Sequence, residues 1–238
     1  MKESRKGEKM EESLRKLSEK IVNYSLKLKE GERVLITTMI EAKPLVLALL
    51  DSMKDKEIVP VVRFTDPEVA SSLTNMTTDK RIELLKKMGM QDVDNYDAFI
   101  SIRYSTNDYE NKEVSSSIVQ KIGEALKESS HIRTNERKWI LLNYPSKLDA
   151  YKAGMKSSTY FRYAMDVMNV DYKDLEERVR PLKELMEKTN EVRIISPGTD
   201  LTFSIKDIPV IPCLGTCNLP DGEIYTAPVK TSVNGYIT

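Results

Sequence analysis

The sequence is poor in the side chains that bind transition metals. Among 238 residues there is one histidine, His131, and there are two cysteines, Cys213 and Cys217. A structural zinc site normally needs four such ligands, and the chain contains no His-Glu-x-x-His sequence. Two cysteines are also too few for a disulfide framework. We interpret His131 as a surface or structural residue and the cysteines as structural, with a reactive thiol as the alternative.

Long hydrophobic runs and an excess of one charge are also missing. No stretch approaches the roughly 18 apolar residues that cross a bilayer, and the N-terminal region lacks an apolar core of the secretory type. Lys and Arg number 37, as do Asp and Glu, so no net charge favours nucleic acid or an anionic membrane. We therefore expect a cytoplasmic protein with no nucleic-acid and no membrane partner. Glutamine is rare while Lys and Glu are plentiful, which suits heat adaptation.

Short apolar runs alternate with helical patterns over the first 145 residues. The runs predict strands at 34–36, 59–64, 98–102 and 139–142, and the apolar spacing between them predicts helices at 11–29, 42–53, 66–88 and 112–127. Gly31 is the expected cap of the first helix, and Thr77 marks a break in the third. Such alternation produces crossover connections. We predict an α/β fold, an open and mostly parallel sheet with helices on both faces.

The turn after the first predicted strand carries no glycine. Its residues, Thr37-Thr38-Met39-Ile40-Glu41, differ from the glycine-rich loops that let phosphates approach the backbone. A nucleotide site is therefore disfavoured. Several tyrosines and arginines are interpreted as packing and rim residues, with the lining of a substrate channel as the alternative: Tyr104, Tyr109, Tyr160, Tyr163, Tyr225, Arg103 and Arg162.

The pattern changes near residue 190. Residues 146–190 are predicted to be helical with breaks near Gly154, Asp171 and Pro181. Beyond this point short strands at 192–195 and 201–205 flank a turn, and prolines and glycines recur. We predict two domains, 1–190 as an N-terminal α/β domain and 191–238 as the start of a β-rich α+β domain. The sequence stops within an apolar run, so we expect the second domain to be interrupted.

The segment Asn218-Leu219-Pro220-Asp221-Gly222-Glu223 carries the strongest chemical signal. A Pro-Asp-Gly turn can present the following side chain, that of Glu223, in a fixed direction. A carboxylate held in this way is a suitable ligand for a divalent cation. From spacing alone, a hairpin turn followed by an exposed glutamate remains the alternative.

This segment closely resembles the signature of the thermophilic metalloprotease family of aminopeptidases, also called the aminopeptidase T or aminopeptidase S family. Three further segments are similar to the family in order and spacing. The region from 17 to 36 resembles its opening helix and strand, 139–155 its middle, and 198–201 the turn that begins its second domain. The resemblance extends over residues 10 to 238.

The resemblance implies a metal-dependent aminopeptidase that removes N-terminal residues from peptides through a dinuclear zinc or cobalt centre. Glu223 corresponds to the first metal-binding glutamate of the family. The family's other ligands find no counterpart in this chain, so 191–238 is expected to be the truncated beginning of the metal-binding catalytic domain, with no catalytic residue and a fragment inactive alone. The resemblance also implies a homodimer. The alternative is a non-catalytic α/β binding or assembly module derived from that family.

Overall fold

The chain forms two compact units in a computed structural model that describes residues 2–238, with side chains described from Gly7 onward. The first unit comprises the chain up to Asn169 together with Thr216–Pro220. The second comprises Val170–Gly215 and Asp221–Thr238. The boundary expected near residue 190 falls at the end of a helix that belongs to the second unit, and residues 216–220 return to the first.

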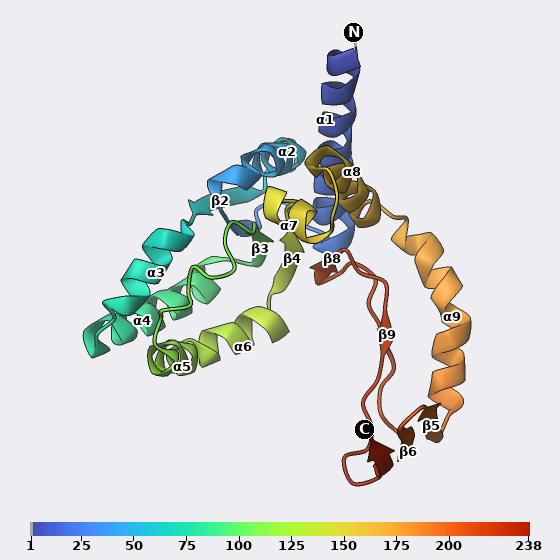
Figure 1. The fold of residues 1–238 in the computed structure, drawn as a ribbon. Helices are drawn as coiled ribbons and strands as arrows, with labels where there is room; N and C mark the ends of the chain where they lie inside the picture. Colours follow the sequence, from blue (N-terminus) through green and yellow to red (C-terminus); the bar gives the residue numbers. More distant parts are fainter. Residues whose placement is uncertain (1) are drawn as a thin grey trace. The chain divides into compact units, whose positions relative to one another are not determined.

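The first unit is built on a five-stranded sheet in which every pair of neighbouring strands is parallel (Figure 1). This confirms the predicted open parallel sheet. The strand order is β2-β1-β3-β4-β8. The strands are β1 (Arg33–Thr38), β2 (Val59–Phe64), β3 (Ala98–Arg103), β4 (Lys138–Asn143) and the short β8 (Asn218–Leu219).

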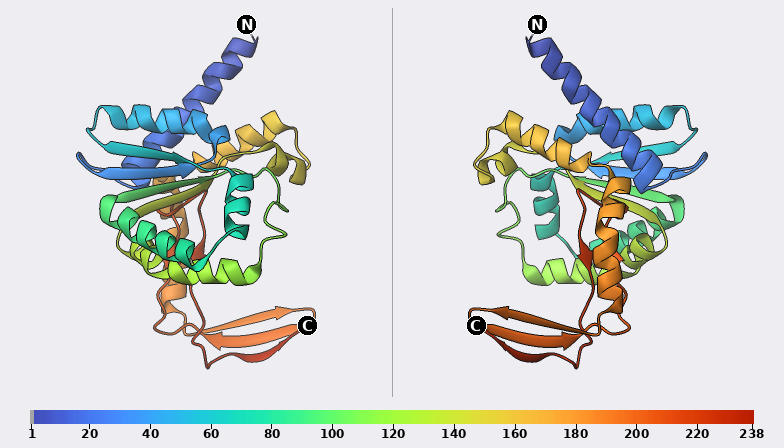
Figure 2. Two further views of the ribbon diagram at one scale, coloured as in Figure 1. Left: turned by 90° about the vertical axis from the view of Figure 1, so that its left-hand side faces the viewer. Right: turned by 90° about the vertical axis from the view of Figure 1, so that its right-hand side faces the viewer.

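Helices cover both faces of this sheet (Figure 2). On one side α1 packs against α2 and α8, and on the other α4, α5 and α6 pack together. The predicted helix over 112–127 is observed as the shorter α5, and a further helix, α6, follows it that was not predicted. The helices of the unit are α1 (Lys2–Lys20), η1 (Ile21–Ser25), η2 (Ile40–Ala42), α2 (Lys43–Lys54), α3 (Pro67–Asn75), α4 (Asp79–Asn95), α5 (Ser116–Ala125), α6 (Lys127–Asn135), α7 (Lys147–Lys152) and α8 (Ser157–Met168).

A row of isoleucines crosses the centre of the sheet. The strand register places Ile36 of β1 beside Ile100 of β3, and Ile100 beside Ile140 of β4. All three are at most 1% exposed. Burial of such a side chain contributes about 1.5–3 kcal/mol, so this row is a main source of stability for the unit.

The second unit consists of one long helix and short antiparallel strands. Asp171 caps the helix α9 (Tyr172–Lys188), since its Oδ1 accepts the Lys173 N–H at 2.9 Å. One sheet has the order β10-β6-β5, and a second pairs β7 with β9. The strands are β5 (Glu191–Ser196), β6 (Thr199–Ser204), β7 (Ile211–Pro212), β9 (Ile224–Tyr225) and β10 (Asn234–Ile237).

Two local predictions are wrong. Gly31 does not cap the first helix, because α1 ends at Lys20 and passes into a π-helical turn, η1, and Gly31 lies in a later turn at φ 74°. Pro181 does not break the last helix but lies inside α9. Proline removes one backbone hydrogen bond from a helix. Pro181 and Glu177, whose carbonyl loses that bond, are both exposed, so water can replace it.

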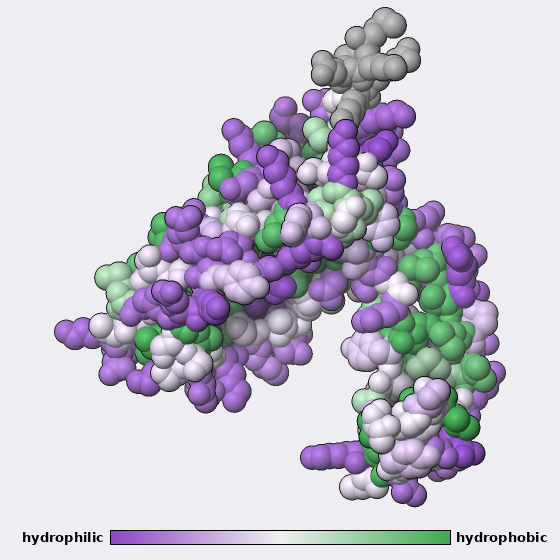
Figure 3. All heavy atoms as spheres, viewed as in Figure 1, coloured by the Kyte–Doolittle hydropathy of each residue, from purple (hydrophilic) through white to green (hydrophobic). Residues whose placement is uncertain are grey.

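Large apolar side chains remain exposed on the second unit. Figure 3 shows hydrophobic surface over α9 and the strands that follow it. The residues concerned are Leu182, Leu185, Ile194, Ile195, Ile211, Tyr225, Val233, Tyr236 and Ile237. In the part of the chain that the structure describes, no helix is both long and apolar enough to span a membrane.

Candidate functional site

The segment that contains Glu223 has an irregular backbone fixed by side chains. It leaves β8, passes through a cis peptide bond between Leu219 and Pro220, and reaches β9 directly after Glu223. Gly222 has φ 146°, which only glycine adopts readily. The predicted presentation of Glu223 at the head of a short strand is therefore observed. The bend itself is held by Asp221 rather than by a turn within the backbone.

Asp221 ties the bend to two neighbouring segments. Its Oδ2 accepts the N–H of Gly215 at 3.0 Å and its Oδ1 accepts the N–H of Gly222 at 3.1 Å. The N–H of Asp221 donates to the hydroxyl of Tyr172 at 3.0 Å. Charge-assisted bonds of this kind are stronger than neutral ones. Both oxygens of the Asp221 carboxylate are therefore used in holding the backbone.

Tyr172 supports this bend from the first turn of α9. The side chain is only 2% exposed. Gly215, at φ 73°, lies against the ring so closely that a Cβ there would come within 2.6 Å of it. The sequence carries no signal for this role, because an aromatic residue at the start of an amphipathic helix is indistinguishable from ordinary packing.

Glu223 combines a fixed backbone with a free side chain. Its carbonyl oxygen accepts the N–H of Cys213 at 2.8 Å, and the next residue, Ile224, pairs with Pro212 between β9 and β7. The residue is exposed, and its carboxylate has neither an ion pair nor a hydrogen bond among the described residues. The carboxylate is thus available as a ligand.

The other candidate ligands do not gather around Glu223. His131 is exposed on α6 of the first unit, where its Nδ1 lies 3.2 Å from Nδ2 of Asn135. Cys213 and Cys217 are of intermediate exposure. Within residues 2–238, no group of three or more His, Cys, Asp or Glu side chains is placed to hold a metal ion. A dinuclear centre needs several protein ligands, so the residues present do not fit such a centre.

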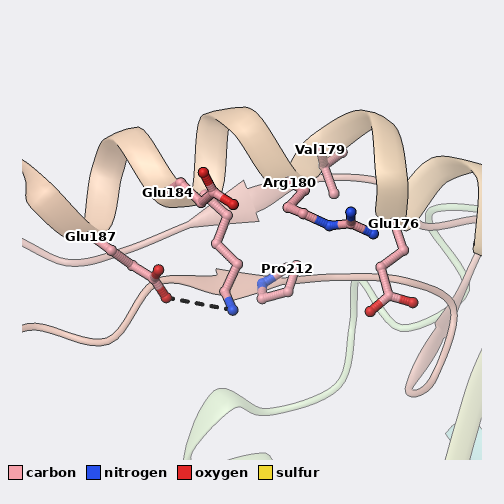
Figure 4. Close-up of a pocket in the computed structure, with 7 residues that line it drawn as sticks. Glu176, Val179, Arg180, Glu184, Glu187 and Pro212 are labelled. Carbon is pink, nitrogen blue, oxygen red and sulfur yellow. Dashed lines mark ion pairs between the residues drawn. The ribbon is translucent and has the colours of Figure 1, made fainter.

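A hollow lies beside α9 and Pro212 (Figure 4). Lys183 Nζ approaches Glu187 Oε1 at 3.4 Å within it. Three acidic and two basic side chains line the opening, which gives no strong preference for a ligand of one charge. The lining residues are Glu176, Val179, Arg180, Lys183, Glu184, Glu187 and Pro212.

Comparison with known proteins identifies a family and solved structures of similar fold. The model of the thermophilic metalloprotease (M29) family matches residues 10–238. The fold is similar to that of wild-type AmpT from Thermus thermophilus, with a TM-score of 0.70 and 20% sequence identity. That match covers 94% of this chain and 63% of the AmpT chain, so the chain spans less than two thirds of the length of the structure it resembles. No curated protein matches the sequence.

Proposed function

The chain belongs to the thermophilic metalloprotease family M29, and from this membership we propose that it is part of an aminopeptidase that removes N-terminal residues from peptides. The observation that carries the proposal is the family match over residues 10–238, which includes the segment around Glu223. A metalloprotease family implies a divalent metal cofactor. Two ions, zinc or cobalt, form part of the proposal.

Glu223 is the proposed metal ligand of this chain. Its exposed carboxylate, without a partner among the described residues, and its fixed backbone support this role. We propose that the remaining ligands come from polypeptide other than residues 2–238, because these residues contain no group of three candidate ligands. The length of AmpT relative to this chain supports that view.

Hydrolysis of an amino-acid amide tests the proposal. Leucinamide cleavage is measured with added cobalt or zinc, for the 238-residue chain alone and for any longer product of the same gene. We expect no turnover by the chain alone and metal-dependent turnover by the longer product. Robust activity with bound metal in the 238-residue chain would contradict the fragment account.

A matched pair of variants tests Glu223 itself. In the active protein, Glu223→Gln is expected to lower metal affinity and activity by about a hundredfold or more, because the loss of a ligand's hydrogen-bonding partner alone costs roughly 10–100-fold. Glu191→Gln changes another exposed glutamate of the same unit and should change neither. Full metal content and activity in Glu223→Gln would remove the residue from the centre.

The alternative is a non-catalytic binding or assembly module of the same family. The five-stranded sheet with its own buried core supports this reading, since it does not depend on metal. Metal binding by the longest gene product distinguishes the two: an aminopeptidase holds divalent ions in stoichiometric amount, and an assembly module holds none.

We also propose that the protein is a homodimer and that it acts on peptides in the cytoplasm. Exposed apolar side chains on the second unit, among them Ile195, Tyr236 and Ile237, support association, because contiguous apolar surface marks interaction sites. Sedimentation velocity at several concentrations measures the state of the protein. A monomer at all concentrations would exclude the dimer.

A further inference from the structure

Strand β2 forms an unpaired edge of the sheet of the first unit (Figure 1). It ends the strand order β2-β1-β3-β4-β8, and among the described residues it pairs with β1 alone. Its sequence, Val59-Pro60-Val61-Val62-Arg63-Phe64, is apolar except for one arginine. An exposed apolar edge strand is a template onto which another strand can be added. The free edge of β2 is therefore a candidate surface for association.

The backbone groups of every second residue of β2 point away from β1. At one end of the ladder the N–H of Val59 donates to the carbonyl of Glu32 at 2.9 Å, and at the other end the N–H of Thr65 donates to that of Thr38 at 2.7 Å. Because backbone groups alternate in direction along a strand, the odd-numbered residues between these two bonds also serve β1. The residues that face outward are Pro60, Val62 and Phe64. Their outward groups make no hydrogen bond with any residue that the structure describes.

Pro60 agrees with this assignment of directions. Proline has no backbone N–H, and in sheets it is found on edge strands with its nitrogen toward solvent. At position 60 it takes no bond from the ladder with β1, since that ladder uses the odd-numbered residues. The free edge therefore presents the N–H groups of Val62 and Phe64 and the carbonyl groups of all three outward residues.

This set of donors and acceptors is complementary to itself. When two copies of β2 lie antiparallel with a two-fold axis at Val62, the N–H of Val62 reaches the carbonyl of Val62 in the second copy. In the same register the N–H of Phe64 reaches the carbonyl of Pro60. Symmetry repeats each bond, and the missing N–H of Pro60 leaves only the carbonyl of Phe64 without a donor. A second copy of the chain thus satisfies most of the outward backbone groups.

Exposed apolar side chains flank this edge on both faces of the sheet. Val61 is exposed on the same face as Arg63, and Phe64 is exposed on the opposite face. On the first face Arg63 contacts Asp92 of α4, so the exposed Met88, one helical turn earlier, lies on the side of α4 that faces β2. Pairing of two copies brings these apolar side chains together and covers them.

The charges of the edge favour a second copy as the partner. Arg63 is the one charged residue of β2, and its Nη1 and Nη2 donate to the two carboxylate oxygens of Asp92 at 2.8 and 3.0 Å. A charge on an edge strand normally opposes pairing, but this charge is neutralised within its own chain. The residue that meets itself at the two-fold axis is the apolar Val62. The formal net charge of the whole chain is zero, so two copies do not repel each other at long range.

We propose that two copies of this chain pair antiparallel through the free edges of β2, which joins their two sheets into one. The inference rests on the homodimer proposed above, and it places the contact on the first unit. Backbone hydrogen bonds and the flanking apolar side chains hold the pair together. Neither depends on a metal ion or on peptidase activity.

Sedimentation velocity and amide hydrogen exchange of the 238-residue chain test this contact. We expect a dimer that dissociates on dilution, with the amides of Val62 and Phe64 protected from exchange only where the dimer is populated. A monomer at all concentrations overturns the inference. Protection of these amides in a monomer also overturns it, because another segment of the same chain would then cover the edge.

Four variants locate the contact. Val62→Pro removes an outward N–H that β1 does not use, and Val61→Lys places a charge opposite Arg63 of the second copy; each should weaken dimerisation about tenfold or more. Val119→Lys changes an exposed valine of α5 and should leave dimerisation unchanged. Circular dichroism checks that each variant is folded. Ile195→Lys, on the second unit, separates the two proposals: a dimer lost in this variant and retained in Val61→Lys would keep the homodimer and overturn the contact through β2.

Discussion

Strand β3 of the first unit buries four of its six side chains, whereas strand β5 of the second unit buries none of its six. The buried apolar side chains of the second unit are few: Tyr172, Ile205, Val210 and Leu214. The first unit is stabilised mainly by burial of apolar surface. In the second unit, directed hydrogen bonds around Asp221 hold the backbone where a core is thin. The two units are thus stabilised by different interactions, and substitutions can separate them.

The largest expected effect comes from the core of the first unit. Ile100→Ala removes most of a fully buried side chain and leaves a cavity, which costs about 2–5 kcal/mol of unfolding free energy. Ile195→Ala, at a position 70% exposed in β5, should change stability by less than about 0.5 kcal/mol. Urea unfolding followed by circular dichroism measures both. Equal losses would show that the two units share one core.

A pair of glycines tests the bend near Glu223. Gly154 and Gly215 both have left-handed φ, but only Gly215 lies against a side chain, that of Tyr172. Alanine should therefore cost about 1–3 kcal/mol more at Gly215 than at Gly154, because the added methyl overpacks the ring. Thermal unfolding of the two variants gives the difference. Similar losses would mean that the ring moves aside without cost.

A pH effect distinguishes two matched ion pairs. Arg33 donates from Nε and Nη2 to Asp97 in the first unit, and Arg193 does the same to Asp200 in the second. In each pair the hydrogen bonds from arginine hold the pKa of the aspartate below its ordinary value. The stability that each adds is present above about pH 4, the ordinary range of aspartate, and is lost as the pH falls through the folded-state pKa.

Asp97 should show the larger acid dependence of the two. It also accepts the backbone N–H of Arg33 at 2.9 Å, but 37% of its side chain is exposed, so the contribution is at most about 1 kcal/mol. We expect Asp97→Asn to reduce the stability difference between pH 6 and pH 2 more than Asp200→Asn does. Unfolding curves at both pH values measure this, and an effect confined to Asp200→Asn would reverse the ranking.

The smallest expected effect is at Glu223. Its carboxylate has no partner among the described residues, so Glu223→Gln should change the unfolding free energy by less than about 0.5 kcal/mol. Differential scanning calorimetry without metal checks this. A large loss of stability would assign the residue a structural role and weaken the ligand proposal.

Local patterns predicted the first four strands of the sheet well. The predicted range 59–64 coincides with β2, and the helix predicted to start at 66 begins at Pro67, where Asp66 accepts the N–H of Val69 at 2.9 Å. These features depend on apolar runs and capping residues close in sequence. These features could be predicted because each depends only on residues that are close together in the sequence.

Pairings between segments that are distant in the sequence could not be predicted from such local patterns. Strand β8 has two residues, and its pairing with β4 joins Leu141 to Asn218 and Leu142 to Leu219. A strand of two residues is too short to show an alternation of apolar and polar side chains, and its partner lies more than 70 residues away. The contact of Tyr172 with Gly215 and Asp221 is equally non-local. Glu223 was found by the resemblance of its segment to the signature of a family.

The return of residues 216–220 to the first unit has a consequence for biosynthesis. The polypeptide leaves the first unit at residue 169, re-enters at 216 and leaves again after 220. During translation, the edge of β4 that receives β8 therefore stays uncovered until most of the second unit has left the ribosome. A single cut in the chain cannot release the second unit intact either, because its two segments flank a strand that belongs to the other unit.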